Sequence, residues 1–99
     1  MFYHVVLMTF SPTADQSFHN EVERYCEQVR RTARNCSQYV YRENLASRAD
    51  GLTHAILSSF ASAADHDAYQ VSTVHQQMKA YMAPYIARIV VCDIDGAMS

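Results

Sequence analysis

The chain has 99 residues, near the usual size of one domain, so we expect a single domain over 1–99 with one core. Apolar residues make up 49% and charged residues 18% of the sequence, a composition that excludes intrinsic disorder. The formal net charge is -2 and the longest basic run is Arg30-Arg31, so we expect neither nucleic acid nor a membrane as a partner.

The first segment is rich in β-branched and aromatic residues over 3–10 and ends at Ser11-Pro12, which predicts a strand. It is too short to span a bilayer and has no basic region before it, so we expect a cytoplasmic location. A capping box from Thr13 to Gln16 predicts the start of a helix. Apolar residues then recur on one helical face, at Phe18, Val22, Tyr25, Cys26, Val29 and Ala33.

The middle of the chain predicts two further strands. Asn35 can close the helix, and the β-formers over 38–45 predict a second strand whose polar end indicates a sheet edge. Ser, Asp and Gly over 46–51 predict a hairpin connection. The run over 52–60 then predicts the third strand.

The last part predicts a broken helix and a strand. A capping box at Ser62 starts a helix to about residue 70, Ser72-Thr73 interrupts it, and a second helical segment runs to about residue 82. Pro84 blocks continuation, and 85–95 predicts a last strand. We expect 96–99 to be a tail.

The element order is βαββαβ, which with right-handed crossovers predicts an α+β, ferredoxin-like fold: one four-stranded antiparallel sheet with its helices on one face. The other face should be polar, yet the first and last strands, which we place centrally, are apolar on both faces. In the last strand Ile86 and Val90 should share the face opposite to Ile89. A second copy packed on the free face would bury roughly 1,600 Å², giving a homodimer and a dimeric α/β barrel. The alternative is an ordinary surface with a few apolar residues.

Several short segments follow one another in a specific order: His4 to Phe10, Glu43-Asn44, Thr53 to Phe60, Asp67 to Tyr69, His75, and Ile89 to Asp93. In order and spacing the chain resembles the stress-responsive dimeric α/β-barrel (Dabb) family over nearly its whole length. The resemblance implies a homodimer with a cleft between sheet and helices, in a family that includes stress-associated proteins without known chemistry and plant polyketide cyclases. One departure is Ser72-Thr73, where the family often has His-Pro.

The resemblance also implies a proton-handling site. In cyclases of the family, positions resembling His4, His54, Tyr69 and His75 line the pocket, so these are our candidate catalytic residues. A neutral imidazole can remove a proton next to a carbonyl, and a tyrosine hydroxyl can hydrogen-bond the oxygen that gains charge, which suits His75 as base and Tyr69 as its partner. The plainer alternative is that strand histidines are satisfied core residues, and matched antiparallel strand ends would separate His4 from His54 by roughly 15 Å.

Other residue types narrow the function. Met8, Met78, Met82 and Tyr81 are candidates for the floor of an apolar ligand pocket, although they fit an ordinary core equally well. There is no H-x-H, H-E-x-x-H or Cys-His cluster and no glycine-rich loop, so we expect no metal and no cofactor. We expect His19 and His66 to be solvated on polar helix faces, and all three cysteines, Cys92 among them, to be reduced packing residues.

The main hypothesis is a dimeric, cofactor-free domain that binds a small, largely apolar molecule in the cleft, with a stress or accessory role. One alternative is a cofactor-free enzyme that transfers protons on a carbonyl compound, as a polyketide-cyclase-like lyase or isomerase, or a cofactor-free monooxygenase. Another is a purely structural assembly block. The sequence alone leaves open whether any reaction is catalysed.

Overall fold

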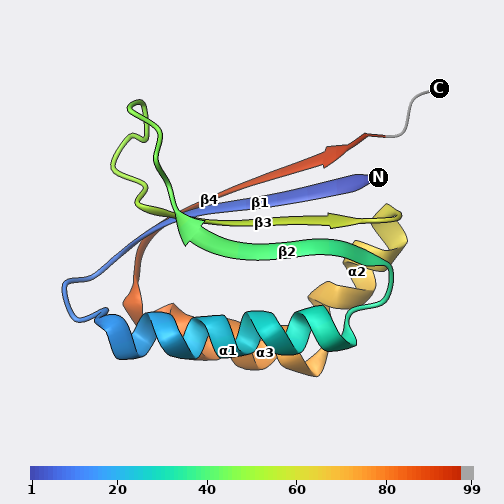
Figure 1. The fold of residues 1–99 in the computed structure, drawn as a ribbon, viewed down its shortest axis with the longest axis horizontal. Coiled ribbons are helices and arrows are strands. Elements are labelled where there is room, and N and C mark those ends of the chain that lie inside the picture. The colour runs from blue at the N-terminus through green and yellow to red at the C-terminus, as the bar shows by residue number, and fades with distance from the viewer. Residues whose placement is uncertain (97–99) are drawn as a thin grey trace.

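A computed structural model describes residues 1–96 and shows a four-stranded antiparallel sheet covered by helices on one face (Figure 1). The elements are β1 (Phe2–Phe10), α1 (Gln16–Thr32), β2 (Cys36–Glu43), β3 (His54–Phe60), α2 (Ala63–Gln70), α3 (Thr73–Met82), the 3-10 turn η1 (Ala83–Tyr85) and β4 (Ile86–Asp95). The predicted α+β, ferredoxin-like βαββαβ order is confirmed. Apart from Gly96, the predicted tail lies outside the described residues.

The strands are ordered β2-β3-β1-β4, and all neighbours pair antiparallel. The prediction that β2 is an edge strand and β1 a central one is confirmed. The prediction that the last strand is central was wrong. β3 is flanked by β2 and β1, and the strand that returns from α3 pairs with the free side of β1, so it forms the second edge.

Helix α1 starts at a different cap from the one predicted. The Asp15 carboxylate accepts a hydrogen bond from the Phe18 amide at 3.0 Å, whereas the Thr13 hydroxyl is bonded to Ser11. The apolar face is confirmed, because Phe18, Val22, Cys26 and Val29 are buried. After the helix, Asn35 adopts φ 54°, a left-handed conformation that asparagine tolerates, and the chain turns into β2.

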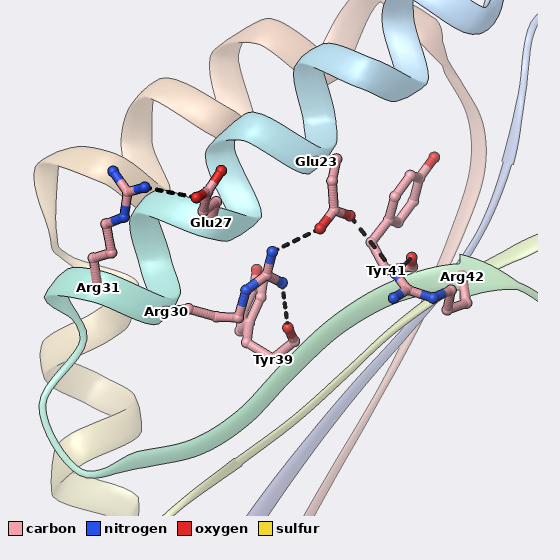
Figure 2. Close-up of polar contacts among 7 residues, drawn as sticks. All are labelled: Glu23, Glu27, Arg30, Arg31, Tyr39, Tyr41 and Arg42. Atoms are coloured by element: carbon pink, nitrogen blue, oxygen red, sulfur yellow. Dashed lines mark hydrogen bonds and ion pairs between the residues drawn. The ribbon is translucent and has the colours of Figure 1, made fainter.

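Charged side chains of α1 hold the helix against β2 (Figure 2). The Arg30 guanidinium donates to the Tyr39 carbonyl oxygen at 2.7 Å and to the Glu23 carboxylate at 2.6 Å (Figure 2). Glu23 also pairs with Arg42 of β2 at 3.7 Å. These contacts fix the backbone from which the Tyr39 side chain enters the core, where it is fully buried.

The predicted break between the last two helices is confirmed. The Ser62 hydroxyl caps α2 by accepting from the Asp65 amide, and the Ser72 hydroxyl caps α3 by accepting from the His75 amide, each at 3.2 Å. Tyr69 thus lies at the end of α2 and His75 in the first turn of α3, so a turn rather than a continuous helix relates the two side chains.

The register divides the sheet into two faces. On β1, His4, Val6 and Met8 are buried toward the helices. Val6 pairs with Val91 and Met8 with Ile89, so these β4 residues share that face. The prediction for Ile86 was wrong: a bulge after Thr9 shifts the register so that Ile86 pairs with Phe10 and lies on the helix-facing side.

The face away from the helices is apolar across three strands. It consists of Tyr3, Val5 and Leu7 from β1, Leu57 from β3, and Val90, Cys92 and Ile94 from β4. Leu57 is 38% exposed and Ile94 53% exposed, and all the helices of the described chain lie on the opposite side (Figure 1). Burial of Cys92 within the chain was a wrong prediction, because β4 is an edge strand and Cys92 faces outward. No helix between residues 1 and 96 is long and apolar enough to cross a bilayer.

Candidate functional site

A cavity of about 450 Å³ lies between the sheet and α3. Its walls are mostly apolar and include Val6, Met8, Met78, Met82, Ile89 and Val91. One part of the lining is polar and is formed by His4, Tyr39, Tyr69, Gln70 and His75, and the exposed residue Lys79 adds a cation to the lining. A volume of this size with a few convergent polar groups is typical of a small-molecule site.

Two buried tyrosines form the centre of the polar lining. The hydroxyls of Tyr39 and Tyr69 are 2.6 Å apart, and the Tyr39 hydroxyl is 3.9 Å from the Met78 sulfur. Burial raises the pKa of both phenols, so both are neutral near pH 7. When Tyr39 donates its proton to the Tyr69 oxygen, the Tyr69 hydroxyl is free to donate to a molecule in the cavity.

The next group is His75, whose tautomer follows from its hydrogen bond. Its Nδ1 lies 2.9 Å from the Gln70 carbonyl oxygen, which can only accept, so Nδ1 carries the proton and Nε2 holds the free lone pair. Burial lowers the pKa of His75, which keeps the ring neutral near pH 7. The Tyr69 ring packs edge-on against His75, with centroids 4.7 Å apart. A neutral base thus lies beside a phenol donor.

On the other side of Tyr69, the His4 side chain in the polar lining is paired with the carboxylate of Asp93. Its Nδ1 lies 2.5 Å from Oδ1 of Asp93, its register partner across β1 and β4. The His4 ring also packs against the ring of His66, with centroids 4.5 Å apart, and edge-on to Tyr69 at 6.3 Å. The carboxylate and these rings hold the imidazole of His4 in one orientation.

The structure brings most of the candidate residues together in the cavity. Of the candidate catalytic residues, His4, Tyr69 and His75 line it. Of the candidate ligand-binding residues, Met8, Met78 and Met82 do so. Side chains from β1, α2 and α3 thus converge on the lining of one cavity, and their roles stay predictions.

Two candidates lie elsewhere. His54 pairs with Met8, four residues along β1 from His4, which separates the two histidines by about 13 Å at about 3.3 Å per residue. His54 packs instead on His19, with centroids 4.7 Å apart, in a separate cleft at the other end of the sheet. Tyr81 does not line the cavity and stacks on Phe18 at 5.7 Å.

The predicted solvation of His19 and His66 was wrong. His66 is only 6% exposed and packs between the rings of Phe2 and Phe60, because α2 turns this position toward the end of the sheet. His19 is half-buried, with Nδ1 2.8 Å from the Tyr41 hydroxyl.

Sequence reasoning also missed Tyr39 and Asp93 as site residues. Tyr39 and Tyr41 alternate on one face of β2, and a buried tyrosine hydroxyl needs a polar partner, which was a usable signal. Asp93 was a second signal, because a carboxylate inside an apolar strand usually has a specific partner.

Burial of neutral histidines predicts a loss of stability in acid. Burial lowers the pKa of His54, His66 and His75 below the ordinary value of about 6.5. Between the lowered and ordinary values the unfolded chain binds more protons, so stability is complete above about pH 6.5 and declines as pH falls through it. We expect the Tm to drop between about pH 7.5 and about pH 5.5. His75→Asn, which keeps an N–H donor for the Gln70 carbonyl, should show a smaller drop; a Tm that is flat with pH in the wild type would contradict this.

Comparisons with solved structures show the same fold. A hydroxynitrile lyase from Passiflora edulis is 22% identical with a TM-score of 0.82, and the match covers 99% of this chain and 96% of that one. A dimeric ferredoxin-like protein of unknown function from Thermobifida fusca is 18% identical with a TM-score of 0.80, covering 94% and 88%. A Caulobacter crescentus protein, provisionally described as an antibiotic biosynthesis monooxygenase, is 15% identical with a TM-score of 0.83, covering 98% and 90%.

These identities establish the fold alone, and no curated protein gives a significant match. The family model of the stress responsive A/B barrel domain, however, matches residues 2–95. Because this match spans nearly the whole chain, the protein belongs to the stress-responsive A/B barrel domain family.

Proposed function

We propose that two copies of the chain pair through their apolar sheet faces and that each copy binds a small, largely apolar molecule in the cavity. The observation that carries the binding proposal is the cavity of about 450 Å³ under α3, apolar along most of its walls and polar in one part. Pairing is supported by the uncovered apolar face and by a structural neighbour described as dimeric. The proposal involves no cofactor.

The lining defines the kind of ligand. Methionine and aliphatic side chains suit an apolar body, because they gain from burial and adapt their shape. Tyr69 suits an oxygen-bearing end group, such as a carbonyl, which would accept a hydrogen bond from the phenol, and Nε2 of His75 can accept a hydrogen bond or a proton from a neighbouring position of the ligand. A stress or accessory role fits such a binder, and both this role and the cytoplasmic location stay predictions.

Thermal denaturation tests the binding. Aliphatic and aromatic ketones are added to the protein, and one that binds at 100 times its Kd should stabilise the fold by about 2.7 kcal/mol. Val91→Trp should abolish the Tm shift, because Val91 lines the cavity at its exposed edge and an indole would fill the space. Val71→Trp is the matched control, since Val71 is exposed and lies outside the cavity. If no compound raises the Tm, or if both variants respond like the wild type, the binding proposal fails.

A second candidate is cofactor-free proton transfer on a carbonyl compound, favoured by the contact between Tyr69 and His75. Nε2 of His75 would take the proton next to the carbonyl, and the Tyr69 hydroxyl would donate to the oxygen as it gains negative charge. The enolate carbon would then attack a second carbonyl carbon of the same molecule, forming a carbon–carbon bond while the C=O π bond opens to an alkoxide, and the imidazolium would return the proton to that alkoxide. A cofactor-free monooxygenase would differ by consuming oxygen during turnover.

A further inference from the structure

Three potential metal ligands meet beside the polar part of the cavity: His4 from β1, His66 from α2 and Asp93 from β4. We propose that these side chains bind one divalent transition-metal ion, with zinc as the type case. No short motif joins positions so far apart in the chain, which is why local spacing predicted no metal. This proposal does not depend on the proposed ligand or reaction.

The geometry is close to what zinc requires. One ligand atom from each residue lies within 4.8 Å of the others, and His4 Nδ1 is already 2.5 Å from Asp93 Oδ1. Zinc bonds of about 2.0–2.2 Å in tetrahedral geometry place ligand atoms about 3.4 Å apart, between these two separations. Binding of the ion would therefore require the side chains to move by about an ångström. Asp93 has the freedom to make such a move, because its side chain is 42% exposed on an edge strand.

The ligand chemistry selects the class of ion. Two imidazoles and one carboxylate suit zinc, iron or nickel, whereas calcium and magnesium prefer sites made of oxygen atoms. The carboxylate of Asp93 supplies negative charge. Three protein ligands would leave a position open for water or a bound molecule.

The surroundings of His66 resemble a supported metal ligand. The rings of Phe2 and Phe60 pack against it with centroids at 4.6 and 5.4 Å, which restrict its rotation. Its Nε2 is 3.0 Å from the Gln70 side-chain nitrogen, and its Nδ1 is 4.0 Å from Asp67 Oδ1. The Gln70 amide nitrogen can only donate, so the proton of the His66 ring is on Nδ1, which faces the Asp67 carboxylate, and a metal ion would bind at Nε2 in place of the Gln70 contact. His4 lines the cavity as well, so an ion held here would lie at its polar part.

Titration of metal-stripped protein with Zn²⁺ and Co²⁺ tests the proposal, by calorimetry and by the visible spectrum of bound cobalt. We expect one ion per subunit and a tetrahedral cobalt spectrum. Asp93→Asn and His66→Phe should each weaken binding at least about tenfold. Asp93 is partly exposed and phenylalanine keeps the ring contacts of His66, so circular dichroism should show both variants folded.

His19→Asn is the matched control, because His19 belongs to the separate histidine cluster near His54 and should not affect binding. Failure of the wild type to bind either ion would overturn the proposal. It would also be overturned if His19→Asn abolished binding while Asp93→Asn and His66→Phe did not. Either result leaves the ketone assay unaffected, so failure of the metal site and failure of the ligand site are distinguishable.

Discussion

Leu57→Asp should convert a dimeric protein into separate subunits. Leu57 belongs to the apolar outer face and lies on inner strand β3, where it pairs with Val5 of β1. In a pair related by twofold symmetry the substitution places two carboxylates in an apolar interface, and burying like charges there costs several kcal/mol. The Kd for dimerisation should therefore rise at least about a hundredfold, since each 1.4 kcal/mol is a factor of ten. Sedimentation velocity at micromolar concentration measures this directly.

Leu45→Asp is the matched control, because it makes the same chemical change at a residue that is 89% exposed in the β2–β3 loop. It should sediment like the wild type. Since Leu57 lies in an inner strand, Val90→Asp on edge strand β4 provides a second test with less risk to folding. A wild type that sediments as one subunit, or two outer-face variants that stay dimeric, would remove the proposed pairing.

His75→Ala should lower turnover of a bound carbonyl substrate by about 10²–10⁴-fold, if proton transfer is the activity. The substitution removes an imidazole whose free lone pair at Nε2 is defined by the hydrogen bond from Nδ1 to the Gln70 carbonyl. Tyr69→Phe should lower turnover by about 10²–10³-fold, because it removes the donor to the developing oxyanion. Steady-state kinetics should show the loss in kcat with little change in KM.

Tyr39→Phe tests the role of Tyr39 in positioning, since this substitution removes the hydroxyl that is bonded to the Tyr69 hydroxyl. It should reduce kcat less than Tyr69→Phe does. Gln77→Ala is a suitable control, because Gln77 is an exposed residue of α3 that does not line the cavity. If the wild type, His75→Ala and Tyr69→Phe turn over every bound substrate at equal rates, proton transfer by His75 and Tyr69 is contradicted. The ligand-binding proposal is then the one that remains.

Some features of the candidate site could be predicted from residues close together in the sequence, and others could not. The helix break at Ser72 was visible in the sequence, and with it the turn that brings Tyr69 and His75 into contact. The separation of His4 from His54 followed from strand geometry. Tyr39 and Asp93 did not emerge as site residues, because their partners, Tyr69 and His4, lie 30 and 89 residues away in the chain.

The sequence by itself determined the order and type of the elements, the apolar face of α1, and the excess of apolar surface on the sheet. These features depend on repeats of 3.6 or 2 residues and on capping groups a few positions apart. Only the tertiary structure decided that β4 is an edge strand, that a bulge turns Ile86 inward, and that His66 is buried beside His4. Strand order and register come from hydrogen bonds between distant segments, and alternation along one strand does not specify which segment it will meet.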